Sequence, residues 1–461
     1  MSTPELCRIV VLGPSGRADL AVPVSTPVTA LLPTLVRQMV RDQKGEEYGA
    51  WVLQRLGEQP FDANGTPETL DWLDGEELYL ARAEDPLPEL DFDDVAEGMA
   101  IAVNRQGNRW NETVNRQLFL SLAAAVLIAI GVVLAEGTGR AAGAVTSGAL
   151  ALVLCVSAVL IAQRLADRSL AAIIGTAGCW YAGLSALIAA SAGGVRSLAP
   201  TAVLLGGVLL AVFAVVLLAV QRLAVAELPI LPFGTSAVLG IAAILAVWLH
   251  LGLGQSSSQT ATVVMCVFLI LLLFAPRLAT RAARLRGPQL PRNADEMTVD
   301  IEPMPAAQVV EQTANADRYL SVLAIGASVV CAVAFGYQLA APGWLEYTIA
   351  GLVAGLVLLR SREFLNISQR LALALAGTWG AVLLAMRLLA GVGDLGRVLG
   401  VLGLLLAALM LVLAARRPAP RRMLPIWPHL GDVLENLSCI ALVPCIAHML
   451  GLFAWARGLA G

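Results

Sequence analysis

The sequence predicts a polytopic α-helical membrane protein with about eleven transmembrane helices and a small soluble domain in front of them. Of its 461 residues, 58% are hydrophobic and only 14% are charged, and the mean hydropathy is +0.75. A soluble chain of this length needs more charged surface, because its exterior must face water. Polar residues concentrate before about residue 115, and beyond it the charges form short clusters between apolar runs.

Strand patterns and one helix pattern describe the front of the chain. Strand-like runs cover 7–13, 18–24, 51–56 and 75–81. Thr26 and Pro27 form an N-cap and first-turn pair, although Pro33 is expected to kink the helix that follows or to delay its start. One amphipathic helix on a small mixed sheet is the ubiquitin-like β-grasp arrangement. We therefore expect a cytosolic ubiquitin-like domain at 1–84, and its lack of a Gly-Gly end favours binding over conjugation.

Eleven apolar runs are long enough to cross a bilayer core of roughly 30 Å, which needs about 20 residues of helix. They lie near 118–136, 143–163, 170–191, 198–220, 233–253, 260–276, 319–340, 343–360, 368–390, 397–415 and 434–456. The predicted organisation is then an acidic, amphipathic cytosolic linker at 85–117, helices one to six at 118–276, a cytosolic loop at 277–318 and helices seven to eleven at 319–461.

Arginine placement predicts the orientation, because cytoplasmic helix ends attract Lys and Arg. With the N-terminus inside, the outer segments hold only Arg140, Arg196, Arg397 and Arg457, and the inner segments hold many more. The opening "MSTPELC" lacks the basic and apolar regions of a secretory signal. We expect a multi-pass protein of the inner (plasma) membrane with a cytoplasmic N-terminus and an extracytoplasmic C-terminus.

The loop after the sixth run opens with "RLATRAARLRG", in which basic and apolar residues alternate. Its basic residues are Arg277, Arg281, Arg284 and Arg286. Such a stretch can lie on anionic headgroups or contact a cytosolic partner. The alternative is a frayed helix extension followed by disorder.

Ionisable residues within a predicted span are costly and often functional. Glu346 begins the eighth span and Arg387 ends the ninth, so both lie near the outer side and can form an intramembrane ion pair. Alternatively, each reaches the outer headgroups on its own. His448 is expected to be a hydrogen-bonded packing residue rather than a proton relay.

Other motifs give no catalytic, cofactor or metal site. "GVGDLG" at 391–396 matches a dinucleotide fingerprint but follows a predicted membrane helix instead of a strand, so we interpret it as a turn. The seven cysteines match no zinc or disulfide spacing and are expected to be packing residues. A net charge of −3 argues against a nucleic-acid partner.

The stretches "RIVVLGPSGRADLAVPVSTPVTALLPTLV" and "GTPETLDWLDGEELYL", followed by eleven spans, resemble EccD. EccD is the polytopic membrane subunit of the actinobacterial type VII (ESX) secretion system. The resemblance implies a complex with EccB, the EccC ATPase, EccE, a second EccD copy and membrane lipids. It also implies that the chain itself is not an enzyme.

Two functions remain to be separated at this point. The first is a non-catalytic membrane scaffold whose ubiquitin-like domain docks the ATPase subunit. The second is a secondary transporter of a small molecule, which would also have about a dozen spans. The predicted midplane is nearly free of charge and no internal repeat is visible, so we favour the scaffold.

Overall fold

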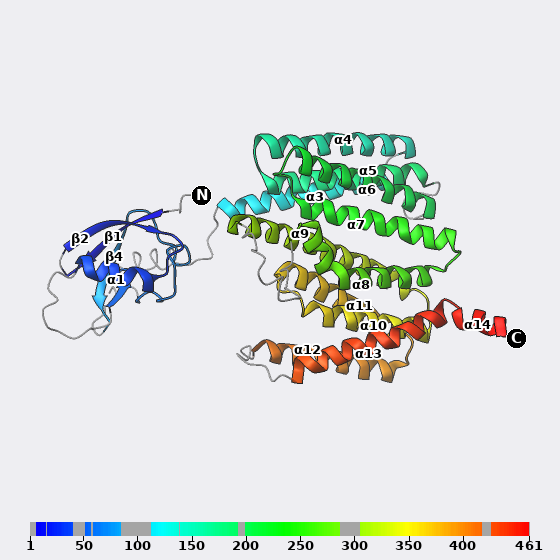
Figure 1. Ribbon diagram of the computed structural model, residues 1–461. Helices are drawn as coiled ribbons and strands as arrows, with labels where there is room; N and C mark the ends of the chain where they lie inside the picture. Colours follow the sequence, from blue (N-terminus) through cyan, green and yellow to red (C-terminus); the bar gives the residue numbers. More distant parts are fainter. Residues whose placement is uncertain are drawn as a thin grey trace, which may run out of the picture. The chain divides into compact units, whose positions relative to one another are not determined.

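The computed structural model describes residues 6–14, 16–39, 51–56, 59–83, 112–137, 139–191, 199–285, 305–416 and 426–460. The chain divides into two compact units, Met1–Asn111 and Glu112–Gly461, and we describe each by itself (Figure 1). The first unit contains a mixed sheet with one helix, and the described part of the second contains eleven helices long and apolar enough to cross a membrane. The predicted fold class is therefore confirmed.

The first unit is a four-stranded mixed sheet with one covering helix. Its strands are β1 (Leu6–Gly13), β2 (Gly16–Pro23), β3 (Trp51–Gln54) and β4 (Glu76–Arg82), in the order β2-β1-β4-β3. β1 and β4 are parallel, which places Val11 opposite Leu78 in the core, and the two outer pairings are antiparallel. The helix α1 (Val28–Met39) packs Val28 and Leu35 into the same core. This is the β-grasp arrangement.

Pro33 does not delay the start of α1, which excludes one of the two outcomes expected from the sequence. The helix begins at Val28 and runs through Pro33. The backbone N–H groups of Val28 and Thr29 donate to the carbonyl oxygens of Gly65 and Ala63, at 2.9 Å each. Because these loop carbonyls satisfy N–H groups that a helix start leaves open, the first turn is held before Pro33 interrupts the helical bonding.

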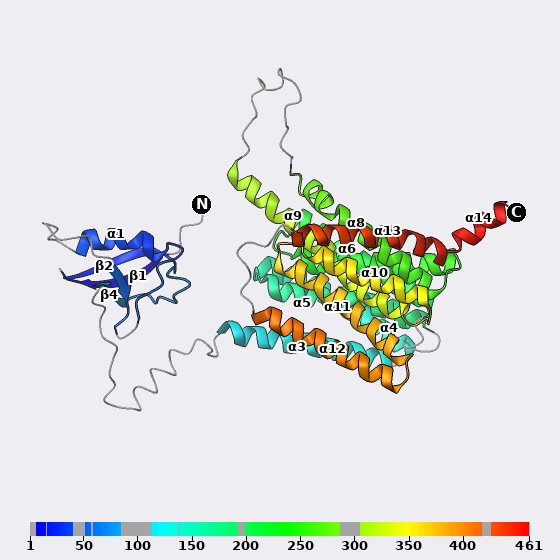
Figure 2. The same ribbon diagram turned by 90° about the horizontal axis from the view of Figure 1, so that it is seen from below.

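The second unit is a bundle of long helices that run side by side (Figures 1 and 2). They are α3 (Glu112–Glu136), α4 (Arg140–Arg164), α5 (Arg168–Ala190), α6 (Pro200–Leu223), α7 (Ile230–Val247), α8 (Ser257–Ala282), α9 (Ala306–Gln338), α10 (Trp344–Ser361), α11 (Ile367–Ala390), α12 (Asp394–Arg416), α13 (Ile426–Met449) and the short α14 (Leu452–Ala460). A π-helical turn, η2 (Trp248–Gly252), continues α7.

Two helices differ most from the predicted spans. α9 has 33 residues and begins at Ala306, well before the predicted residue 319. At 1.5 Å per residue it is about 50 Å long, so it exceeds a bilayer core and its first turns project from the bundle (Figure 2). The last span ends at Met449 instead of 456, because Gly451 adopts a φ of +73° and separates α13 from α14.

Antiparallel neighbours give the bundle two chemically different ends. We call the end where α3 begins the arginine-rich end, and the opposite end the arginine-poor end (left and right in Figure 1). The described arginines near the first end include Arg116, Arg164, Arg168, Arg222, Arg281, Arg318, Arg360, Arg362, Arg370 and Arg416. Those near the second are Arg140, Arg387, Arg397 and Arg457. The observed helices thus keep the arginine asymmetry on which the orientation was predicted.

Glycines allow α5, α6 and α7 to approach closely. A Cβ atom built on Gly183 would lie 3.1 Å from the Gly206 carbonyl oxygen, and one built on Gly240 would lie 2.6 Å from that of Gly207. Gly206 and Gly207 are neighbours in α6, so one faces α5 and the other faces α7. A side chain at Gly207 or Gly240 would push the helices apart, and one at Gly183 or Gly206 would require its neighbour to shift slightly.

Candidate functional site

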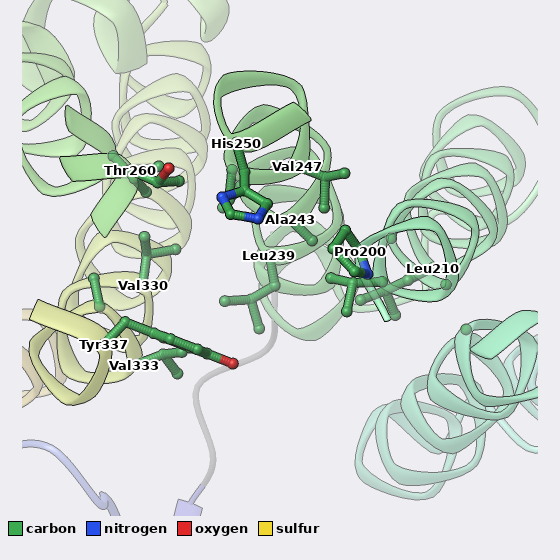
Figure 3. Close-up of a pocket in the computed structure, with 18 of the residues that line it drawn as sticks. Pro200, Leu210, Leu239, Ala243, Val247, His250, Thr260, Val330, Val333 and Tyr337 are labelled. Atoms are coloured by element: carbon green, nitrogen blue, oxygen red, sulfur yellow. The ribbon is translucent and has the colours of Figure 1, made fainter. Parts of the chain in front are cut away.

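An apolar cavity of about 600 Å³ lies between α5, α6, α7, α8 and α9 (Figure 3). Aliphatic side chains such as Leu210, Leu239 and Val330 form most of its wall, and the packed glycines of α5 and α6 also line it. This volume is typical of small-molecule sites, which are mostly apolar with a few fixed polar groups. The described lining residues include no Asp, Glu, Lys or Arg.

The polar lining residues gather toward the arginine-poor end. His250 comes from η2, Ser257 and Thr260 from the first turn of α8, and Tyr337 from the last turn of α9. Figure 3 shows the His250 ring beside the cavity and the Tyr337 ring extending across it. The cavity therefore has apolar walls and one uncharged polar end.

The local structure fixes the hydrogen-bonding state of His250. Its Nδ1 lies 2.7 Å from the carbonyl oxygen of Gln255. A carbonyl oxygen only accepts, so in the neutral ring Nδ1 carries the proton and Nε2 is an acceptor. No hydrogen bond to Nε2 occurs among the described residues. A π-helical turn such as η2 is rare and frequently marks a functional site.

Thr260 adds a second open polar group to this end. The residue is 6% exposed, and its hydroxyl oxygen has no hydrogen-bond partner within the described part of the chain. Most buried hydroxyls are hydrogen-bonded, because leaving one unpaired costs about 1–3 kcal/mol. Among the described residues, Thr260 is therefore an unpaired hydroxyl enclosed in the cavity wall.

The structure places Glu346 and Arg387 at the same end of the bundle but does not show the predicted ion pair between them. Glu346 lies in the first turn of α10 and Arg387 in the last turn of α11, both at the arginine-poor end. No ion pair joins them among the described residues. The pairing stays a prediction.

The predicted basic stretch lies partly within the described residues. Arg277 and Arg281 belong to α8, Arg284 follows it with a φ of +58°, and Arg286 lies outside the described residues. All three described arginines are exposed at the arginine-rich end. Their contact with a partner or with headgroups stays a prediction.

Sequence reasoning missed a cluster of charges between α10 and α13. Arg360 Nη1 lies 3.1 Å from Glu435 Oε1 and 2.8 Å from Glu363 Oε2. Arg362 contacts Asp432 and Glu435. The Glu435 side chain is only 13% exposed. In the sequence, Glu435 stands near the start of the predicted last span, and Arg360 and Arg362 stand at the end of the predicted eighth span.

A buried polar contact was also missed between α8 and α9. Thr262 donates its hydroxyl proton to Gln338 Oε1, and both residues are buried. Gln259, three residues earlier, donates to the carbonyl oxygen of Met449, at 2.9 Å. These bonds hold α8, α9 and α13 together beside the cavity. In the sequence these residues stand out as polar residues inside apolar runs, but the sequence does not show which helices pack together.

The first unit presents an acidic turn just before β4. Glu68, Asp71 and Asp74 are exposed, and Leu73 beside them is 70% exposed. Cys7 lies under this turn, where burial first, then Asp74 and Glu76, raises the pKa of its thiol. An exposed leucine among carboxylates is a candidate surface for a basic partner.

Two family comparisons cover the two units. Residues 115–459 match the family described as the EccD-like transmembrane domain. Residues 6–80 match the family described as WXG100 protein secretion system (Wss), protein YukD. The first match spans most of the chain.

Relatives and solved structures extend the likeness to the whole length. The ESX-3 secretion system protein EccD3 of Mycobacterium tuberculosis, in strains CDC 1551 / Oshkosh and H37Rv, is 26% identical over 482 aligned residues, which cover 98% of each chain. A chain of protomer 1 of the ESX-3 core complex matches with a TM-score of 0.59 and 19% identity, over 98% of this chain and 100% of that one.

A second solved structure, the MycP5-free ESX-5 inner membrane complex in State II, has a chain that matches with a TM-score of 0.56 and 20% identity. The match covers 90% of this chain and 100% of that chain. Both structural likenesses concern the fold. Together with the match over residues 115–459, they lead to one conclusion: this chain belongs to the EccD family of membrane proteins.

Proposed function

We propose that this chain is a non-catalytic membrane subunit of a type VII (ESX) secretion complex in the inner membrane. The observation that carries the proposal is the alignment over 98% of both chains with a protein named as an ESX-3 secretion system component. A likeness of this extent includes the soluble unit and every span, so it supports the same kind of role. The uncharged cavity does not favour ion-coupled transport, which uses ionisable groups near the midplane.

We further propose that the first unit docks the ATPase subunit, the EccC partner that the resemblance implies. The acidic turn, with its exposed Leu73, offers both charge and apolar area to a basic surface. A docking domain at the end of a linker also has a high effective concentration near its partner, which strengthens a weak interface.

The docking proposal is tested by deleting residues 1–84 and purifying the complex from membranes. We expect the membrane portion to insert and to associate with itself, but to retain little ATPase and to secrete poorly. Leu73→Lys tests the surface more finely, with Thr34→Lys on the exposed face of α1 as the control. Normal ATPase recovery and export with the deletion would contradict the docking role. It would leave the membership of the complex intact.

Two helices of the bundle support contacts with other subunits. In α3 and α12 the most apolar 18-residue windows are 0% buried within the chain. Within α12, Gly400 faces Leu389 of α11, whereas Gly403 has open space around it. We propose that α3 and α12 face lipids, a second EccD copy, EccB or EccE. A cysteine at Leu405→Cys, on the exposed side of α12, should then cross-link in membranes to a second copy of the chain or to another subunit. The buried Leu373→Cys should not cross-link.

We propose that the arginine-rich end faces the cytosol. There the arginines at 277–286 contact anionic headgroups or a cytosolic partner. This orientation follows the arginine asymmetry of the helix ends.

A further inference from the structure

We propose that the cavity between α5 and α9 binds one uncharged, hydroxyl-bearing lipid of the acylglycerol type. Its acyl chain lies along the aliphatic walls, and a glycerol hydroxyl donates to His250 Nε2 beside the Thr260 hydroxyl. The site lies within a single chain. The inference concerns a ligand of the bundle and holds independently of the secretion role.

The shape and the walls of the cavity select an acyl chain. The wall residues come from α5, α6, α7 and α9 and are almost all aliphatic, so a polar ligand would lose its hydration there without replacement bonds. Its rim includes Trp180, Val333 and Tyr337, which are 51%, 58% and 48% exposed. Because these rim residues lie on membrane-spanning helices, a chain can enter sideways from the bilayer.

The polar end selects a hydroxyl group. His250 Nε2 is an open acceptor, because Nδ1 donates to Gln255. The Thr260 hydroxyl can both donate and accept and has no partner among the described residues, and a rotation of its enclosed side chain would turn it toward a ligand. A glycerol hydroxyl can donate to the first and accept from the second. A simple ester can accept from Thr260 but has no proton to give to His250.

The absence of charge in the described lining excludes charged headgroups. A carboxylate or phosphate brought to this wall would lose water and gain no cation, which is far more costly than burying a hydroxyl. A free fatty acid or an anionic phospholipid is therefore a poorer ligand than an acylglycerol with the same chain.

The test uses the full-length protein in detergent and a monoacylglycerol with a diazirine on its acyl chain. After illumination, peptide mass spectrometry locates the adduct. We expect labelling on the lining segments of α7 and α9, with 1-monooleoylglycerol as an effective competitor. Methyl oleate, which has no hydroxyl, should compete about three- to ten-fold less well, as the loss of one hydrogen bond predicts. Oleate, which is charged, should compete less well still, because its carboxylate would lose its hydration.

Three variants separate this site from general lipid contact. Val333→Trp places a large ring at the cavity rim and should reduce the adduct about ten-fold. The control Val133→Trp changes a residue of equal type and similar exposure, 61%, on α3 outside the cavity, and should leave labelling unchanged. The double variant His250→Phe, Thr260→Val should keep the adduct but remove the preference for 1-monooleoylglycerol over methyl oleate.

Several results would overturn the proposal. Equal labelling of Val333→Trp and Val133→Trp would show that the probe does not occupy the cavity. Equal competition by 1-monooleoylglycerol and methyl oleate in the unaltered protein would remove the hydroxyl site. Stronger competition by oleate would assign a charged ligand instead. Thermal melting of each variant shows whether the fold is retained, and Thr260→Val alone, an isosteric change, repeats the headgroup test if the double variant is unstable.

Discussion

The two ends of the helix bundle are held together by different forces. At the arginine-rich end, ion pairs join different helices or the segments at their ends: Arg116 of α3 lies 2.6 Å from Asp167, the N-cap of α5, and Arg168 of α5 lies 2.8 Å from Glu227, between α6 and α7. At the arginine-poor end, Arg397 and Asp394 form an exposed contact of 3.7 Å within a single helix, α12. Ion pairs between helices or their ends therefore fix helix spacing at one end, whereas the other end has fewer arginines and a cavity lined by no Asp, Glu, Lys or Arg among the described residues.

The largest expected effect comes from the buried charges of the arginine-rich end. Replacing Glu435 by Leu leaves Arg360 and Arg362 without their shared carboxylate in a poorly solvated position. We expect a loss of about 2–3 kcal/mol in the free energy of unfolding, at or below the low end of the cost of breaking a buried pair, because Glu363 and Asp432 still pair with the two arginines. Thermal melting of the detergent-solubilised protein measures it.

Glu363→Leu is the matched control for Glu435→Leu, because Glu363 also pairs with Arg360 but its side chain is 44% exposed. It should cost no more than about 1 kcal/mol, as exposed pairs do. Equal losses in the two variants would mean that the cluster between α10 and α13 is only a surface feature.

The next effect concerns the glycine contacts beside the cavity. Gly240→Ala places a methyl group against the backbone of α6 and should destabilise the bundle by about 1–3 kcal/mol, as overpacking does. Gly355→Ala meets nothing within 4 Å, so it should be neutral or stabilise by up to about 1 kcal/mol through helix propensity. The two substitutions should therefore change the melting temperature in opposite directions, because one disturbs packing and the other raises helix propensity. A change in the same direction for both would contradict the packing interpretation.

A smaller effect is pH dependence at the arginine-rich end. Asp167 caps α5, and the hydrogen bond from the Leu170 N–H, followed by Arg116, lowers the pKa of its carboxyl despite partial burial. A lowered folded-state pKa gives stability that is present above the ordinary value of about 3.9 and is lost as pH falls through the folded pKa.

Asp167→Asn keeps a good cap but removes the charge. Its melting temperature should therefore fall below that of the unaltered protein near pH 7, and the two should converge as pH falls below about 4, the ordinary aspartate pKa. A gap that does not change with pH would show that the carboxylate charge contributes nothing.

The smallest expected effect is at the arginine-poor end. If Glu346 and Arg387 pair in the membrane, Arg387→Leu should lower the yield of assembled protein more than the double variant Glu346→Leu, Arg387→Leu, because the single change leaves a carboxylate alone. The difference should correspond to about 1 kcal/mol or less for so exposed a pair. Equal yields would favour independent headgroup contacts.

The sequence predicted the features that depend on local patterns. Apolar runs of about 20 residues and the alternation of arginines are both local signals, so the eleven spans and the two ends were predictable. The β-grasp unit was predictable from period-two strands around one amphipathic helix. The extension of α9 was not, because residues 306–318 are polar and helical propensity alone is weak.

The candidate site depends on which helices pack together, and local sequence patterns do not predict these helix–helix contacts. Thr260 and His250 are ordinary polar residues in the sequence, and only the packing of η2 and α8 with the neighbouring helices places them on one cavity. The same is true of Glu435, whose arginine partners lie more than 70 residues earlier. The close contacts at Gly207 and Gly240 also involve glycines without special spacing.

We expect the two ends of the bundle to face opposite sides of the membrane, with the arginine-rich end in the cytosol. The most direct test is thiol labelling of intact cells with an impermeant reagent. Ser257→Cys reports the arginine-poor end, and Ser25→Cys reports the first unit, since both positions are exposed. The native Cys7 is unsuitable as a reporter because it is buried at 6% exposure. We predict that Ser257→Cys is labelled in intact cells and Ser25→Cys only after lysis; labelling of Ser25→Cys without lysis would contradict the account.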